Sequence, residues 1–199
     1  MKLLVLSQPE WIDGESEILS HLLSLPGFEL LLRKPEASEA QQSALIEALD
    51  PKHYPRLWLR GAPILTLEYG LAGHHFPQNQ RPQAVCWRRR LRKAGCRLST
   101  GVHDPRELVQ LEGYDRALFS PVFDSISKPG HRPNYKPAEL EAGLRKLPFE
   151  VFGMGGVRAD KLGQLKSKGF KGAAILGALW EATDAFEALK QIIKQAQTP

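Results

Sequence analysis

The chain has 199 residues, of which 42% are hydrophobic and 25% are charged, a composition typical of a globular protein with one substantial core. No stretch approaches the roughly 20 consecutive apolar residues of a membrane span, and the first residues lack the apolar region of a signal peptide. We therefore expect a single cytoplasmic domain over residues 1–199 with no membrane partner. The two cysteines, Cys86 and Cys96, are too few for a disulfide framework or a thiolate metal site, so we expect both to be reduced and structural.

The net charge of +5 comes from one basic run, Arg88 to Lys93, which holds five cations and leaves the rest of the chain neutral overall. Cys86 and Trp87, directly before this run, and Leu91 within it can line one side of a short helix, which predicts that the cations face water. Because the positive charge is confined to one segment, we do not expect nucleic acid as a partner. The alternative is that this basic run forms a nucleic-acid or docking patch.

Short apolar runs alternate with helical patterns along the whole chain, and glycine, proline or acidic residues separate them. The predicted strands are Leu3 to Leu6, Phe28 to Leu32, Leu57 to Leu59, Gly73 to Phe76, Arg97 to Thr100, Arg116 to Phe119, Glu150 to Phe152 and Ala173 to Leu176. The predicted helices are Ser16 to Leu25, a segment capped by Ser38, Pro63 to Tyr69, a segment from Asp104 to Leu111, Ala138 to Leu147, Ala159 to Lys168 and Asp184 to Gln195. Strands that alternate with helices pair in parallel.

Eight strand-helix units predict an α/β fold, a compact single-domain (β/α)8 barrel near the lower size limit, with a stunted helix near Trp87. An open doubly wound sheet is the alternative, but no G-x-G-x-x-G follows the first strand. In a barrel the site forms at the carboxyl ends of the strands.

Two segments at such ends are suited to phosphate. The loop after the sixth strand carries Ser125, Ser127 and Lys128, which offer hydroxyl donors and a positive charge. After the seventh strand, Gly155 and Gly156 leave backbone N–H groups open to an oxyanion, and Gly177 forms a similar turn after the eighth. Ordinary turns also favour these residue types.

Several segments resemble the thiamine phosphate synthase/TenI superfamily, in the right order from about Leu30 to Trp180. They read RKPEAS, EYGLAGHHFPQ, STGVHDPREL, FSPVFDSISK, FGMGGV and GAAILGALW. The resemblance implies a (β/α)8 barrel that binds a small-molecule thiazole phosphate ligand. It also raises the expectation of a homodimer, because the family often dimerises.

Residue roles follow from the same resemblance. Gly155, Gly156 and Gly177 would hold the thiazole phosphate. The residues Ser125, Ser127, Lys128, Arg33 and Lys34 would form a pyrophosphate or anion site, although arginine and lysine are adjacent here and one residue apart in the synthase.

The departures from the family pattern concern the synthase chemistry. The synthase couples a pyrimidine pyrophosphate to thiazole phosphate with Mg²⁺ held on carboxylates. Arg60 with Gly61 stand at the position of its N-D motif, and no aspartate occurs between Leu57 and Pro82. We therefore expect no metal ligands and no cofactor, with Mg²⁺ required only if the synthase alternative holds. Asp124, in the anion loop, is the residue that would restore a metal site.

His103 is retained, and in the TenI branch, which resembles a thiazole tautomerase, this histidine transfers a proton on the thiazole carboxylate phosphate. An imidazole suits that task because it takes and returns protons near neutral pH. His75 is a candidate substrate contact or a structural histidine, and His131 is expected to face solvent. The leading hypothesis is a thiazole tautomerase-like isomerase. Its alternatives are a thiamine phosphate synthase with altered metal ligands and a non-catalytic phosphate-binding protein.

Overall fold

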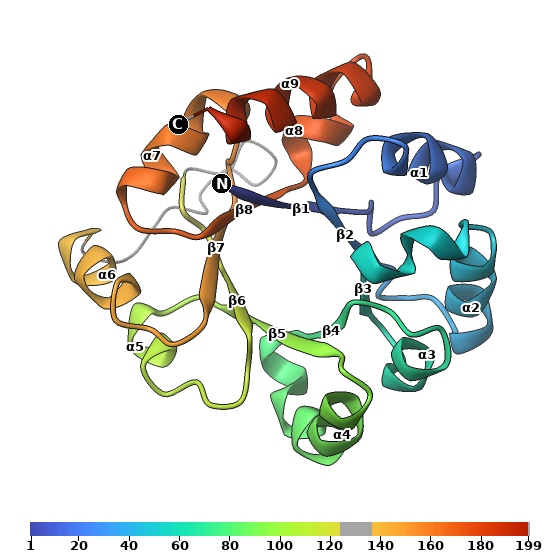
Figure 1. Cartoon of the computed structure of the whole chain (residues 1–199), viewed down its shortest axis with the longest axis horizontal. Coiled ribbons are helices and arrows are strands. Elements are labelled where there is room, and N and C mark those ends of the chain that lie inside the picture. Colours follow the sequence, from blue (N-terminus) through green and yellow to red (C-terminus); the bar gives the residue numbers. More distant parts are fainter. Residues whose placement is uncertain (124–136, 199) are drawn as a thin grey trace.

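The computed structural model describes residues 1–123 and 137–198, with backbone alone for residues 137–139. Eight parallel strands close into a barrel in sequence order, and helices surround it (Figure 1). The strands are β1 (Lys2–Leu6), β2 (Glu29–Arg33), β3 (Leu57–Arg60), β4 (Gly73–Phe76), β5 (Arg97–Val102), β6 (Arg116–Phe119), β7 (Glu150–Met154) and β8 (Gly172–Ile175). The predicted (β/α)8 barrel is confirmed, and the open sheet is excluded because β8 pairs with β1.

The helices that periodicity predicts are present within a few residues of their expected bounds, and α8 (Gly177–Trp180) is an additional short helix where a glycine turn was expected. They are α1 (Glu15–Leu23), α2 (Glu39–Glu47), α3 (Pro63–Glu68), α4 (Arg81–Lys93), α5 (Pro105–Leu108), α6 (Pro137–Leu144), α7 (Leu162–Ser167), α8 (Gly177–Trp180) and α9 (Ala185–Gln197), with 3-10 turns η1 (Pro51–Arg56), η2 (Gln78–Gln80) and η3 (Ala159–Lys161). Ser38 caps α2 through a capping box with Gln41, and Asp104 and Asp184 cap α5 and α9.

The helix around Trp87 is not stunted, which corrects the expectation. α4 has 13 residues, because arginine and lysine are good helix formers that extend the helix through the basic run. Its buried face is set by Ala84 and Leu91, seven residues apart, so Cys86 lies on the exposed side, contrary to the prediction. Cys96 is buried, as expected for a structural cysteine. No helix within the described ranges is long and apolar enough to cross a bilayer.

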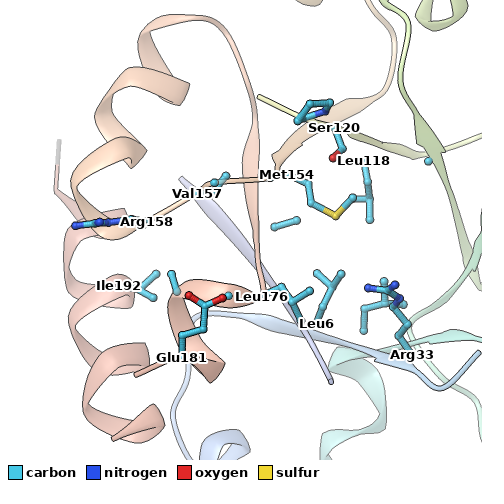
Figure 2. A pocket seen from close by; sticks show the side chains of 18 of the residues that line it. Leu6, Arg33, Leu118, Ser120, Met154, Val157, Arg158, Leu176, Glu181 and Ile192 are labelled. Carbon is cyan, nitrogen blue, oxygen red and sulfur yellow. The ribbon is translucent and has the colours of Figure 1, made fainter. Parts of the chain in front are cut away.

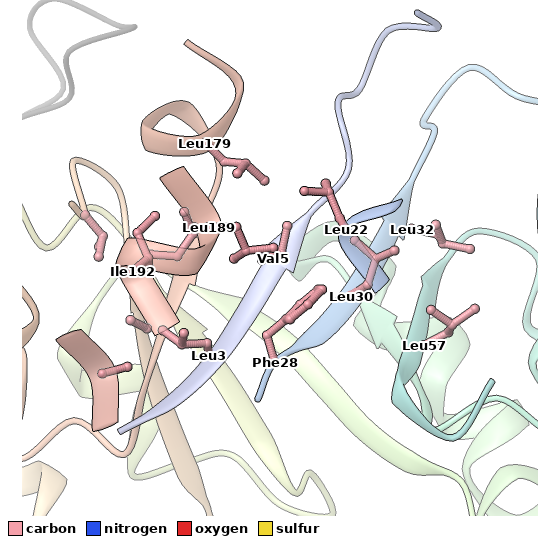
Figure 3. Packing of buried hydrophobic residues seen from close by; sticks show 14 of the residues in the cluster. Leu3, Val5, Leu22, Phe28, Leu30, Leu32, Leu57, Leu179, Leu189 and Ile192 are labelled. Carbon is pink, nitrogen blue, oxygen red and sulfur yellow. The ribbon is translucent and has the colours of Figure 1, made fainter. Parts of the chain in front are cut away.

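Alternation along each strand divides the core into two parts. Leu3 and Val5 of β1 face outward and pack with Leu179, Leu189 and Ile192 of the C-terminal helices (Figure 3). A smaller inner cluster fills the barrel itself with Leu4, Leu6, Leu31, Trp58, Leu118, Phe152 and Ala174. Because side chains alternate between faces, the next inward positions on β2 and β3 are Arg33 and Arg60, at the carboxyl end.

Arg116 closes the opposite, amino-terminal end of the barrel. Its guanidinium is 1% exposed, lies 4.0 Å from the ring centre of Phe152 and 4.5 Å from that of Trp58, and donates to Glu29 at 2.6 Å. Burial opposes ionisation of Glu29, but the charges of Arg116 and Arg97 hold its pKa below the usual value. With this end filled, the barrel is open only to a ligand at the carboxyl ends of its strands.

Candidate functional site

A cavity of about 1120 Å³ lies at the carboxyl ends of the strands (Figure 2). Its floor is apolar, formed by Leu6, Leu31, Leu118, Met154 and Leu176. Polar and glycine residues from the loops after β2 to β8 form the walls. A cavity with an apolar floor and a few convergent polar groups is suited to a small molecule with an aromatic ring and charged substituents.

The structure separates the two basic residues that follow β2. Arg33 lines the cavity, whereas Lys34 is 3% exposed and not among the lining residues. Lys34 Nζ lies 2.6 Å from Oε2 of Glu15 and donates to the carbonyl oxygen of Glu10 at 2.6 Å. Adjacent residues of an extended chain point to opposite faces, so the two cannot serve one site. The structure therefore does not support the expectation that Lys34 belongs to the anion site.

The residues that replace the N-D motif do not fit a magnesium ion. Arg60 brings a cation into the cavity, and Gly61 lies against the side chain of Gln42. A Cβ at Gly61 would stand 1.9 Å from Oε1 of Gln42, which accepts the N–H of Ala62 at 2.9 Å. Among the described residues, no three His, Cys, Asp or Glu side chains are arranged to hold a metal ion. The amide of Gln42 thus occupies the space that a carboxylate would need.

His75 points into the barrel and His74 points toward the helices, as expected for neighbours on one strand. His75 lines the cavity, is 6% exposed and bonds Ser99 Oγ through Nδ1 at 2.7 Å, while His74 bonds Thr66 Oγ1 at 2.8 Å. Burial, assisted by the charge of Arg60, lowers the pKa of His75 to about 3. His75 is therefore neutral at physiological pH and adds a polar contact without a charge.

His103 lies at the rim of the cavity, directly after β5. Its Nδ1 lies 2.8 Å from the carbonyl oxygen of Ser120. A carbonyl only accepts, so Nδ1 carries a hydrogen, and Nε2 is the ring nitrogen left to exchange a proton with a ligand. No bond joins Nε2 to any residue in the described part of the chain. This geometry suits proton transfer to and from a bound ligand.

The two glycine turns, at Gly155–Gly156 and at Gly177, follow the neighbouring strands β7 and β8. Gly155 and Gly156 have φ values of 93° and 63°, a left-handed conformation that glycine adopts without strain. The N–H groups of Gly156, Val157, Gly177 and Ala178 donate to no acceptor within residues 1–123 and 137–198. All four residues line the cavity, so this corner offers free donors to an oxyanion.

Glu181 and Arg158 also line this corner, and the sequence motifs do not include them. Figure 2 shows Glu181 beside Leu176 and Ile192, with Leu6 between it and Arg33. Oε1 of Glu181 lies 2.9 Å from the position that a Cβ at Gly177 would occupy, so the carboxylate covers the glycine turn. Because both side chains are exposed, they can turn aside for a ligand. Glu181 follows directly after α8 and Arg158 lies in the loop after β7, each just beyond the motif that the sequence shows there.

The anion loop lies outside the described residues. Ser125, Ser127 and Lys128, together with Asp124 and His131, fall within residues 124–136. Of the predicted site residues that are described, the cavity unites His103, His75, Arg33, Gly155, Gly156 and Gly177.

Comparisons with known proteins agree with this architecture. A family model described as thiamine monophosphate synthase matches residues 28–179. A thiamine-phosphate synthase of Listeria monocytogenes serotype 4b (strain CLIP80459) is 28% identical over 163 residues, which cover 78% of this chain and 74% of that protein.

Solved structures give the same result. A thiamine phosphate pyrophosphorylase from Bacteroides thetaiotaomicron superposes with a TM-score of 0.80 at 25% identity and covers 98% of both chains. One from Pyrococcus furiosus has the same fold, with a TM-score of 0.79 at 17% identity over 99% of this chain and 97% of the other. The match to the family model covers the barrel from β2 to α8, including both glycine turns and His103. The chain therefore belongs to the thiamine monophosphate synthase (TMP-TENI) family.

Proposed function

We propose that the chain is an enzyme of thiamine biosynthesis that transfers a proton on a phosphate-bearing thiazole, as a thiazole tautomerase does. The orientation of His103 carries the proposal. Its Nδ1–H is engaged by the carbonyl of Ser120, so Nε2 faces the ligand as the group that removes a proton from one carbon and returns it to another. A single imidazole performs both steps, and no metal is needed.

Binding is assigned to the two sides of the cavity. The free N–H groups around Gly156 and Gly177 are suited to the phosphate, and Gly155 allows the chain to approach it closely. The apolar floor is suited to the thiazole ring. Glu181 is exposed and is expected to turn toward solvent when the phosphate enters, with Arg158 beside the same corner.

The test is turnover of thiazole carboxylate phosphate by the purified protein and by His103→Asn. We expect the substitution to lower kcat by about 10²- to 10⁴-fold, the usual contribution of general acid-base catalysis. Affinity for thiazole phosphate should change by less than about threefold, because the phosphate contacts lie elsewhere. His21→Asn, on the exposed surface of α1, is the matched control and should retain full activity. Retention of kcat by His103→Asn would exclude His103 as the proton carrier.

The names of the curated relatives favour a second candidate, thiamine phosphate synthase. That reaction joins hydroxymethylpyrimidine pyrophosphate to thiazole phosphate and releases pyrophosphate. The described residues argue against its metal site, because the amide of Gln42 fills the space beside Gly61, where the N-D motif has its aspartate, and Arg60 brings a cation next to it. Formation of thiamine phosphate that depends on Mg²⁺ would establish the synthase instead. Binding of thiazole phosphate without turnover in either assay would favour a binding protein.

A further inference from the structure

Arg33 and Arg60 form a pair of cations inside the mouth of the barrel. They are register partners on the parallel strands β2 and β3, and both line the cavity. Paired parallel strands lie about 4.8 Å apart, and residues in register point to the same face. The two guanidinium groups are therefore neighbours that face one space.

No carboxylate within the described ranges forms an ion pair with either arginine. The Nε of Arg33 is buried without a hydrogen-bond partner in the same ranges. Burial lowers the pKa of both guanidinium groups, and the charge of Arg33 lowers the pKa of Arg60 further. The charge of Glu10 raises the pKa of Arg33 and is the one opposing effect. Two neighbouring cations with no carboxylate partner among the described residues destabilise a fold, so their presence in the cavity is suited to an anion supplied by a ligand.

Arg60 lies on the side of the mouth opposite the Gly155–Gly156 turn, while Arg33, on β2, is two strands from β8 and the Gly177 turn. In the closed barrel of eight strands, β3 is four strands from β7 in either direction, so Arg60 faces the Gly155–Gly156 turn across the mouth. The apolar floor lies between them, and His103, after β5, lies midway along one wall. A ligand that spans this cavity would carry an oxyanion at each end of an apolar ring, with its edge near His103.

We propose that Arg33 and Arg60 form a carboxylate subsite, which selects a thiazole that carries a carboxylate at the end opposite its phosphate. The identity of the ring and of the phosphate end rests on the proposed function. The specific contribution of this chain is Arg60, which stands where the synthase pattern has an amide and converts a neutral contact into a cationic one. Guanidinium groups bind carboxylates through paired, charge-assisted hydrogen bonds.

The test compares two ligands with four proteins by calorimetry. The ligands are thiazole carboxylate phosphate and thiazole phosphate, and the proteins are the parent, Arg60→Gln, Arg60→Lys and the surface control Arg89→Gln. We expect the parent and the control to bind the carboxylate about 10- to 100-fold more tightly than thiazole phosphate, the effect of charge-assisted hydrogen bonds. Arg60→Gln should remove at least tenfold of this preference and leave thiazole phosphate affinity within about threefold. Arg60→Lys should retain part of it.

Thermal unfolding distinguishes a binding role from a structural one. Arg60→Gln removes repulsion between two partly buried cations, so its Tm should equal or exceed that of the parent. Undiminished carboxylate preference in Arg60→Gln would overturn the proposal. The proposal would also be overturned if the parent bound inorganic pyrophosphate tightly and Arg60→Gln abolished that binding but left the carboxylate preference unchanged. The two arginines would then form a diphosphate site.

These measurements need no turnover, so they separate the two proposals. Carboxylate preference that depends on Arg60 in a protein without tautomerase activity would leave the subsite standing and refute the proton transfer. Tautomerase turnover by the parent, with an unchanged carboxylate preference in Arg60→Gln, would support the proton transfer and refute the carboxylate subsite. Failure of both thiazoles to bind the parent would refute both.

Discussion

Lys34 provides a direct test of how the structure assigns the two basic residues after β2. Lys34 and Glu15 are 3% and 4% exposed, and the ammonium lies 2.6 Å from the carboxylate. Lys34→Met removes the cation and leaves Glu15 buried without a counter-charge. Breaking a buried ion pair in this way typically costs about 3–5 kcal/mol. For a chain of this length, each kcal/mol lowers Tm by about 2–4 °C, so we expect a fall of roughly 10 °C.

Denaturant unfolding of the variant at several pH values measures the effect. Burial raises the pKa of Glu15, although Lys34 opposes the shift, so in Lys34→Met the carboxyl should take up a proton more readily than in the unfolded chain. A carboxyl with a raised pKa in the folded state gains stability as pH falls, and the deficit of the variant should shrink toward pH 5. The double variant Glu15→Gln with Lys34→Met should recover most of the stability, because it leaves no buried charge.

Ligand binding supplies the refuting result. Since Lys34 lies outside the cavity, the affinity of Lys34→Met for thiazole phosphate should stay within about threefold of the parent. A variant that unfolds within about 1 kcal/mol of the parent but loses pyrophosphate binding would show that Lys34 serves the anion site after all.

Two further predictions concern stability. His74 and His75 have pKa values lowered to about 3 by burial, so their stabilising contribution is complete above pH 6.5 and is lost as pH falls toward 3. His74→Asn should reduce the acid slope of the unfolding free energy by up to about 1.4 kcal/mol per pH unit, as measured by denaturation between pH 4 and 6, and an unchanged slope would contradict the assignment. Gly155→Ala should destabilise by about 1–3 kcal/mol, because φ is 93° and a Cβ would stand 3.1 Å from Cα of Pro121. Gly143→Ala in α6 is its control and should be neutral or stabilising, since a Cβ there meets no atom of the described residues within 4 Å. Equal effects of the two substitutions would refute the steric argument.

The architecture was accessible from the sequence because each element repeats one local signal. Apolar runs such as Leu3 to Leu6 and Leu57 to Leu59 lie within the observed strands, and Ser38, Asp104 and Asp184 act as the helix caps that their residue types predict. The expectation of a stunted helix near Trp87 was wrong because it rested on the small size of the barrel, whereas the arginines and lysine of this segment have good helix propensity and continue α4.

The site was less accessible, because its decisive features depend on contacts between distant segments. Whether the side chain of Lys34 points into the barrel or away from it depends on where β2 ends, because a shift of one residue along a strand reverses the face on which a side chain lies. The amide of Gln42 that fills the space beside Gly61 comes from the preceding helix, 20 residues away from the Ala62 N–H it accepts. Arg158 lies in the loop after β7 and Glu181 directly after α8, and no local pattern marks them as part of the cavity.

The most direct test of the account is proton transfer observed by NMR in D₂O with thiazole carboxylate phosphate as substrate. If Nε2 of His103 removes a proton from one carbon and delivers one to another, the parent protein should form the aromatic isomer. Because His103 is exposed, the proton held on its ring exchanges with solvent, so we expect deuterium at the receiving carbon in part or all of the product. His103→Asn should form the aromatic isomer no faster than the uncatalysed control. Deuterium incorporation by His103→Asn at the rate of the parent would contradict the central claim.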